Sequence, residues 1–574
     1  MKKFLIGLVA GLLLAGLAIV VFAFSLLRFG ERRPVIADGS TLVLELGGDA
    51  PERAPVEIPL AMFQAATPLT VIEVWDILRK AAADPRIRAV VVEPLATTAG
   101  WGKIEEFRES LVRFKRSNKP LIAFLRNPGL RQYYLATAAD KIYVTGEDLL
   151  DLKGLRAELM FLRGTLDKLG VRFEVEHAGR YKDAADMFTR TGTTPETREV
   201  MNSVLDHLYG HLVDTIARSR KLTPEKVRAA LDDGPLLAEK AKAAGLVDGL
   251  LFHGEVYEQL RRQIGQSGIR NVSTRDYARI PASTLGLEGD ARIAVLIGEG
   301  MILRGAGDVG SLDDDAIVSG PFNRLIRQVA AEPGIRGVIA RIDSPGGDAI
   351  ASDEILHELK ALSRRKPMVI SMSDTAASGG YYISMTGDPV VAYPHTLTGS
   401  IGVIYGKLNL RGLYDKLGVQ KEILMRGQNA DIDSDYRPLT DAGRKKLREG
   451  IENVYRSFLD RVAEGRRKKR EEIAPLAEGR VWLGAQAKNN GLVDELGGLD
   501  RAIELVKKKA GIGPEEKIRL VIYPGKRSIF DHLFGRREEP LVEAKIRHLL
   551  GGLDLRLWRQ GGMMRLAPYT IQLR

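Results

Sequence analysis

The sequence of 574 residues contains no cysteine. This absence excludes disulfide bonds, zinc sites built from thiolates and cysteine nucleophiles, although it does not indicate a cellular compartment. The chain also lacks a recognisable nucleic-acid-binding motif, so we expect no nucleic-acid partner despite a net charge of +11. Its length exceeds that of one domain several times over, which predicts two or more domains.

Charge is missing from one long stretch near the N-terminus, residues 4–27. A helix of this length can cross about 30 Å of hydrocarbon, so residues 1–33 are predicted to contain a transmembrane anchor. A cleaved signal peptide is the alternative. The run is longer than the usual apolar region of such peptides and no small-x-small cleavage site follows it, which favours a retained anchor. Basic residues flank the run on both sides and leave its orientation open.

The most informative feature is an internal repeat. Four pairs of similar segments occur in the same order, three of them offset by 248 residues and the last by 246. They are DPRIRAVVV at 84–92 with EPGIRGVIA at 332–340, YYLATAAD at 133–140 with YYISMTGD at 381–388, GTLDKLGVRFE at 164–174 with GLYDKLGVQKE at 412–422, and AKAAGLVDGL at 241–250 with AKNNGLVDEL at 487–496. The chain therefore contains two copies of one domain, predicted at residues 34–285 and 286–512.

Within each copy, short apolar strands alternate with segments of helical periodicity. Residues 89–92, 121–124 and 142–144 have the strand pattern, and stretches such as VIEVWDILRKAA have the helical one. This alternation predicts parallel βαβ units and hence an α/β fold, in which functional groups gather where strands end and helices begin. The remaining residues, 513–574, form a basic amphipathic extension that fits either an anionic membrane surface or an ordinary packed helix.

One serine of the second copy is absent from the first. Ser378 lies in AASGGYYISMTG and is followed by two glycines, whereas positions 130–132 of the first copy read LRQ. A small residue at a tight turn is the simple interpretation. However, a serine followed by glycine leaves the next backbone N–H free to face a developing oxyanion, and the turn IDSPGGD at 342–348 can supply a second N–H. Ser378 is therefore a candidate nucleophile.

A serine hydroxyl needs a base, and the sequence offers two. His395, with Asp374, would complete a Ser-His-Asp triad. Lys182, in HAGRYKDAAD, is the other candidate, because the aligned loop at 427–431 reads GQNAD and keeps the glycine and the aspartate without the amine. A buried lysine with a lowered pKa can act as a general base. Since one copy has the serine and the other the lysine, we favour a Ser-Lys dyad assembled between the two domains.

These motifs resemble those of a known family. DSPGGD, TAASGGYYIS, TLTGSIGV, GRYKDAADMF and the repeated GLVD are similar to the signal peptide peptidases of the long, duplicated bacterial type, also called protease IV, over residues 40–510. The resemblance implies an α/β protein of two tandem ClpP/crotonase-like repeats behind an N-terminal transmembrane helix. It also implies that Ser378 is the nucleophile and Lys182 the general base.

The same resemblance assigns further residues. Ser400, in TGSIG, matches the serine that positions the lysine, and the backbone N–H groups of Gly379 and of Gly346 or Gly347 match the oxyanion hole. No metal and no cofactor is expected. The GxGxxG match at 305–310 is followed at once by three aspartates, which would repel a pyrophosphate, and is interpreted as a flexible loop.

Location and partners also follow from the resemblance. It implies a single-pass protein of the bacterial cytoplasmic (inner) membrane, with the N-terminus of residues 1–33 in the cytoplasm and the catalytic body on the periplasmic side as a homotetramer. Its substrates would be signal peptides and other membrane-associated peptides. Two alternatives remain open at this point, a crotonase-type acyl-CoA enzyme and a membrane scaffold without proteolytic activity.

Overall fold

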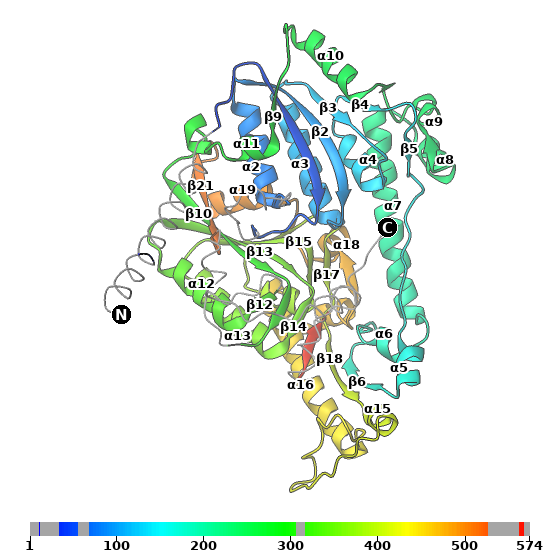
Figure 1. Cartoon of the computed structure of the whole chain (residues 1–574). Coiled ribbons are helices and arrows are strands. Elements are labelled where there is room, and N and C mark those ends of the chain that lie inside the picture. Colours follow the sequence, from blue (N-terminus) through cyan, green and yellow to red (C-terminus); the bar gives the residue numbers. More distant parts are fainter. Residues whose placement is uncertain (1–10, 12–33, 55–67, 306–315, 526–561, 567–574) are drawn as a thin grey trace.

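The computed structural model describes residues 11, 34–54, 68–305, 316–525 and 562–566 (Figure 1). The predicted anchor at 4–27 and the GxGxxG loop lie wholly or mostly outside these residues, as does most of the predicted C-terminal extension. Among the described residues, no helix combines the length and the apolar composition that crossing a bilayer requires.

The first sheet consists of six parallel strands in the order β8-β4-β3-β2-β1-β9. Its strands are β1 (Ser40–Gly48), β2 (Ile87–Thr97), β3 (Leu121–Phe124), β4 (Lys141–Val144), β8 (Gly249–Leu250) and β9 (Arg270–Ser273). The helices of this part are α2 (Val71–Ala83), α3 (Trp101–Lys115), α4 (Leu130–Ala136), α5 (Arg163–Leu169), α6 (Asp186–Thr189), α7 (Pro195–Arg220), α8 (Pro224–Asp232), α9 (Ala238–Ala243), α10 (His253–Ile264) and α11 (Thr274–Ala278), and β5 (Leu149–Leu150) pairs with β7 (Leu236–Leu237). We call β1 to α11 the first repeat.

The second sheet has the same plan. Its main path is β19-β17-β15-β13-β10-β21. In addition, β16 pairs with β15 and β20 pairs with β16, and all pairs except β17 with β19 are parallel. The strands are β10 (Ala291–Glu299), β13 (Ile335–Ser344), β15 (Met368–Ala377), β16 (Val390–Ala392), β17 (Leu397–Gly399), β19 (Val481–Leu483), β20 (Glu495–Leu496) and β21 (Ile518–Tyr523). The helices are α12 (Ser319–Ala331), α13 (Ala349–Ser363), α14 (Gly379–Ile383), α15 (Arg411–Lys416), α16 (Asp441–Arg466), α17 (Arg470–Ile473), α18 (Gly484–Asn490) and α19 (Leu499–Lys509). We call β10 to β21 the second repeat.

The two repeats match in detail, which confirms the predicted α/β fold. β9 lies beside β1 as β21 lies beside β10, so the strand at 518–523 belongs to the second sheet although it lies within the predicted extension. Helices α7 and α16 each have 26 residues, begin after a threonine whose hydroxyl accepts a backbone N–H, and end at a residue of positive φ. The threonine caps satisfy N–H groups that have no partner inside the helix.

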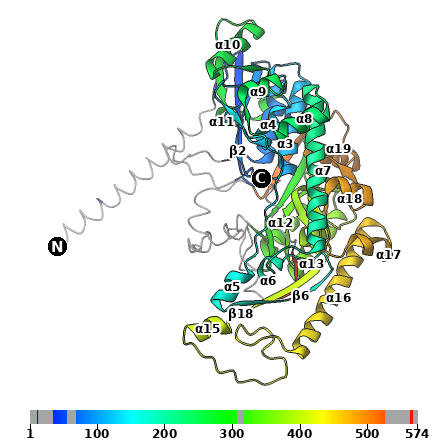
Figure 2. The same cartoon turned by 90° about the vertical axis from the view of Figure 1, so that its right-hand side faces the viewer.

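A third, mixed sheet joins the repeats. Its order is β12-β11-β14-β22-β18-β6, with strands β12 (Ala316–Val318), β11 (Met301–Leu303), β14 (Gly346–Asp348), β22 (Met564–Leu566), β18 (Val403–Asn409) and β6 (Arg172–Ala178). Strand β6 of the first repeat pairs antiparallel with β18 of the second over seven residue pairs, from Val403 with Ala178 to Asn409 with Arg172. In Figure 2, α7 extends from the level of the first sheet down alongside the second repeat, where it contacts β19.

Buried ion pairs also cross between the repeats. The Arg341 guanidinium, on β13, is buried and donates to both carboxylate oxygens of Glu52, at 3.1 and 2.9 Å, and to Glu106 on α3. Burial alone would raise the pKa of Glu52, but the positive charge of Arg341 and the hydrogen bonds hold it below its usual value. Removing one partner of such a group would leave an uncompensated charge in the interior, so these contacts hold the repeats in one arrangement.

Candidate active site

Ser378 lies where the central strand β15 turns into the short helix α14. Its backbone has φ 53° and ψ −113°, a conformation that is rare for a residue other than glycine, and its side chain is buried. The Ser378 N–H donates to the Gly399 carbonyl at 2.8 Å, which continues the pairing of β15 with β17 past the end of the strand. Strain of this kind is common where a side chain has to be presented at a strand end.

Lys182 reaches Ser378 from the other repeat. It lies four residues after β6, and the pairing of β6 with β18 sets the path of this loop. The Tyr181 N–H donates to the Glu478 carbonyl at 2.8 Å and fixes the loop against the second repeat. The Lys182 Nζ atom then lies 2.8 Å from the Ser378 Oγ atom, with both side chains buried. The structure thus brings together two residues that are 196 positions apart in the chain.

Burial lowers the pKa of the Lys182 amine well below its usual value; the Asp183 charge opposes this shift and the Arg565 charge adds to it. The neutral amine has two hydrogens and one lone pair. Two of its three close contacts are to Ser400, at 2.8 Å to the carbonyl and 3.0 Å to the hydroxyl oxygen. If these accept the two hydrogens, the lone pair faces the Ser378 hydroxyl, which is the arrangement that a general base needs.

A backbone hydrogen bond fixes the position of Ser400. It follows β17, has φ 50°, and its N–H donates to the Arg480 carbonyl at 2.7 Å. Because β17 pairs with β15, with Ala377 opposite Gly399, the two serines follow neighbouring strands at the same edge of the sheet. This common edge explains how one lysine contacts both.

The predicted oxyanion glycines also gather here. Gly379 is the first residue of α14, so its N–H has no acceptor within the helix. A Cβ atom built on Gly379 would lie 3.0 Å from the Gly347 nitrogen, and one on Gly346, where φ is 101°, would lie 2.5 Å from the Gly379 nitrogen. Only glycine permits this approach. The Gly346 N–H donates to the Ser344 hydroxyl at 3.1 Å, and Gly347 pairs with Arg565 of β22, so both alternatives for the second donor have contacts in this structure.

The structure does not bring together the members of the alternative triad. Asp374 accepts hydrogen bonds from the Gly100 and Lys103 N–H groups, both at 2.8 Å, at the N-terminus of α3. His395 lies beside Glu105 and His211, where burial lowers its pKa to about 3. Among the described residues, Lys182 is the titratable side chain within hydrogen-bond distance of the Ser378 hydroxyl.

Sequence reasoning missed one strand of this site. In β22, Arg565 lies opposite Gly347 and Leu566 opposite Gly346, so a segment close to the C-terminus pairs antiparallel with the glycine turn. The Arg565 guanidinium lies 3.5 Å from the centre of the Tyr382 ring and donates to the Ala349 carbonyl at 2.9 Å. A strand of three residues carries too little periodicity to be recognised in a sequence.

Comparison with known proteins adds independent support. The family model described as peptidase family S49 matches residues 113–267 and 360–513, one segment in each repeat. The chain is 36% identical over 447 residues to "Serine protease SPPA, chloroplastic" of Arabidopsis thaliana, which covers 77% of this chain and 66% of that protein. It is 33% identical over 460 residues to "Protease 4" of Salmonella typhi, covering 77% and 72%, and 30% identical over 449 residues to "Protease 4" of Haemophilus influenzae, covering 76% and 72%.

The chain has two α/β repeats whose sheets are mainly parallel, and each repeat matches a peptidase family. Together these findings define a duplicated serine peptidase. More specifically, the chain belongs to peptidase family S49. The family resemblance inferred from DSPGGD, TAASGGYYIS and GRYKDAADMF is thereby confirmed, as is the internal duplication.

Proposed function

We propose that this chain is a membrane-anchored endopeptidase with a Ser378-Lys182 dyad that degrades signal-peptide remnants. One observation carries the proposal: the buried Lys182 Nζ atom lies 2.8 Å from the Ser378 Oγ atom, and each residue comes from a different repeat. The first sheet, which is parallel, and the second, which is mainly parallel, support a ClpP/crotonase-like fold in each repeat, with helices on the sheets and the site at a strand end. The pairing of β21 with β10 supports a second repeat that extends to Tyr523.

In the proposed mechanism, neutral Lys182 takes the proton of the Ser378 hydroxyl as its Oγ atom attacks the scissile carbonyl carbon. The tetrahedral oxyanion accepts hydrogen bonds from the N–H groups of Gly379 and of Gly346 or Gly347. The carbon–nitrogen bond then breaks, and the Lys182 ammonium returns its proton to the leaving amine. Water, deprotonated by the same lysine, hydrolyses the ester, and the proton returns to Ser378.

The pairing of β14 with β22 supports an extended binding mode for the substrate. The glycine strand β14 accepts an antiparallel strand, Met564–Leu566, next to the proposed oxyanion hole. Backbone pairing of this kind recognises extended peptides with little regard to sequence. A substrate would pair with β14 in place of this segment, which suits an enzyme that degrades many different signal peptides.

The proposed location and assembly rest on other features. The uncharged run at 4–27 supports an anchor in the bacterial inner membrane, with the body on the periplasmic side as the family resemblance implies. Exposed apolar side chains lie on or beside the touching helices α5 and α15, and they support contacts in a homo-oligomer, a tetramer by resemblance. These side chains are Leu169, Leu417, Val419 and Leu424.

The substrate class can be tested with two peptides of equal length. One has the apolar core of a signal peptide, and in the other four central leucines are replaced by serine. With the full-length protein in detergent micelles, we expect the apolar peptide to be cleaved with about tenfold or greater kcat/KM, measured by mass spectrometry of the products. Equal rates would contradict the signal-peptide proposal. Cleavage of neither peptide, together with stoichiometric binding of a CoA thioester, would favour the crotonase alternative.

Replacing Ser400 with alanine tests the positioning of the lysine. The change removes the hydroxyl 3.0 Å from the Lys182 Nζ atom but leaves the carbonyl contact. We expect kcat to fall about 10- to 100-fold with little change in KM, because the lone pair of the amine is no longer held toward Ser378. A rise in KM at constant kcat would indicate a role in substrate binding instead, and thermal unfolding serves as the control for structural damage.

A further inference from the structure

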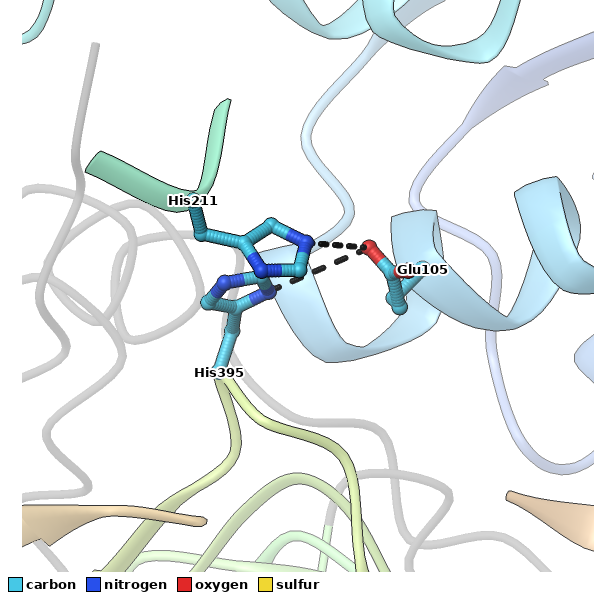
Figure 3. A group of neighbouring side chains, drawn as sticks. All are labelled: Glu105, His211 and His395. Carbon is cyan, nitrogen blue, oxygen red and sulfur yellow. Dashed lines mark ion pairs between the residues drawn. The ribbon is translucent and has the colours of Figure 1, made fainter. Parts of the chain in front are cut away.

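Glu105, His211 and His395 form a cluster outside the Ser378-Lys182 site. Glu105 lies on α3 and His211 on α7, both in the first repeat, whereas His395 lies between β16 and β17 in the second. Figure 3 shows the two imidazole rings side by side with the Glu105 carboxylate facing both. The ring centres are 4.3 Å apart, and the two ring planes are nearly perpendicular. The cluster is therefore a meeting point of the two repeats.

The spacing of the polar atoms is close to that of a metal centre. The Glu105 Oε2 atom lies 3.6 Å from the His211 Nε2 atom and 4.0 Å from the His395 Nδ1 atom. One ligand atom from each of the three residues lies within 4.8 Å of the other two. Ligands around a tetrahedral zinc ion are about 3.3 Å apart, given bonds of about 2.0 Å. The two distances to Glu105 would have to shorten by less than about 1 Å, and the separation of the two imidazole nitrogens by about 1.5 Å at most, which side-chain rotations can supply.

His395 supplies the second observation. Its side chain is 3% exposed, and among the described residues its Nδ1 atom has no hydrogen-bond partner. Buried polar atoms are normally paired, and one that is not calls for an explanation such as an unseen ion. The Nδ1 atom faces the Glu105 carboxylate at 4.0 Å, too far for a hydrogen bond but suitable for sharing a cation.

We propose that Glu105, His211 and His395 bind a Zn²⁺ ion that connects the two repeats. Two imidazoles and one carboxylate are a known zinc ligand set, with water in the fourth position. Imidazole nitrogens favour zinc over magnesium or calcium, which prefer oxygen ligands. The side chain of His211 is 28% exposed, so water and the ion can reach the centre from that side.

A tyrosine hydroxyl lies next to the proposed ligand atoms. The Tyr134 hydroxyl donates to the Glu105 Oε2 atom and lies 3.1 Å from the His211 Nε2 atom. Because both atoms are proposed ligands, the hydroxyl has to turn away from them when the ion binds. The expectation of no metal came from the catalytic motifs, and the proposed ion takes no part in their chemistry. The proposed ion stabilises the arrangement in which the Lys182 amine lies beside the Ser378 hydroxyl. The proposal of a zinc site does not depend on the proposed peptidase function.

Metal binding by the purified full-length protein tests the proposal. After removal of metals with a chelator, we expect one Zn²⁺ per chain in competition with a chromophoric chelator, and an affinity about 100-fold or more lower in His395→Ala and in His211→Ala. His207→Ala is the matched control, because His207 lies on α7 one turn before His211, and it is expected to bind zinc as the wild type does. Co²⁺ in the site should give the absorption bands of a tetrahedral ion.

Thermal unfolding provides a readout that is independent of peptidase activity. Zinc should raise the Tm of the wild type and of Ser378→Ala equally, because a ligand that binds only the folded state stabilises it. It should leave the Tm of His395→Ala unchanged. The proposal is overturned if no stoichiometric zinc is bound, or if wild type and His395→Ala bind it with equal affinity. The three side chains would then be a hydrogen-bonded cluster only.

Discussion

Replacing Ser378 with alanine is expected to lower kcat/KM for peptide cleavage about 10⁴-fold or more, with the fold retained. The alanine lacks the oxygen that lies 2.8 Å from the Lys182 amine, so no acyl-enzyme can form. The turn itself should persist, because alanine keeps the Cβ atom and removes only the hydroxyl group. Initial rates with a fluorogenic peptide measure the loss, and circular dichroism checks the fold.

Ser384→Ala is the matched control for this experiment. Ser384 is also buried and lies just after α14, where its hydroxyl donates to the Gly380 carbonyl at 2.8 Å. We expect this variant to retain activity within about tenfold, since its hydroxyl is a structural contact. Labelling with a fluorophosphonate should occur in Ser384→Ala and be absent from Ser378→Ala. Undiminished peptide cleavage by Ser378→Ala would refute the assignment of the nucleophile.

Replacing Lys182 with methionine is expected to have two opposite effects. Activity should fall about 10³-fold or more, because no other described titratable group lies within reach of the Ser378 hydroxyl. Stability should rise at neutral pH, because the folded wild-type protein buries a lysine whose pKa is lowered well below its usual value, and this cost exceeds the loss of the two contacts with Ser400. Kinetic assays and urea unfolding measure the two effects on the same preparation.

The stability difference should depend on pH in a definite direction. Between the lowered pKa of folded Lys182 and its unfolded value near 10.4, the unfolded wild type binds more protons than the folded one. The stability of the wild type therefore rises with pH across this window, and the advantage of Lys182→Met shrinks. The rise of kcat/KM with pH should level off at the lower edge of this window, since the amine of the folded enzyme is neutral above its own pKa and only the neutral amine acts as a base.

Lys407→Met is the comparison for a buried lysine without a catalytic role. Lys407, on β18, donates to the Ser434 and Arg437 carbonyls at 2.8 and 2.7 Å and lies 3.8 Å from Glu174. Its replacement should lower stability, because two carbonyl groups and a carboxylate lose their partner. If Lys182→Met were destabilised as Lys407→Met is, or kept full activity, Lys182 would be a structural residue and not the base.

Much of the site could be anticipated because the repeat acts as an internal control. Comparing the copies separated Ser378 and Lys182 from the framework that both halves share, and periodicity alone predicted parallel βαβ units. Comparison between the copies did not indicate that His211 and His395 lie together. The two residues are 184 positions apart, and such a spacing forms no recognisable sequence motif. The role of Asp374 was likewise hidden, because its partners are the N–H groups of Gly100 and Lys103 in the other repeat.

The sequence by itself determined the α/β class, the duplication and the family, and it predicted Ser378 and Lys182 as the catalytic pair, because these follow from local patterns and from similarity between the copies. Only the tertiary structure decided how the halves meet. The pairing of β6 with β18, the burial of Arg341 against Glu52 and the strand β22 beside the glycine turn are contacts between distant segments. Backbone hydrogen bonds and buried charges select such partners by geometry in the folded chain, and a linear pattern does not record that geometry. The short distance between the Lys182 amine and the Ser378 hydroxyl is a product of that packing.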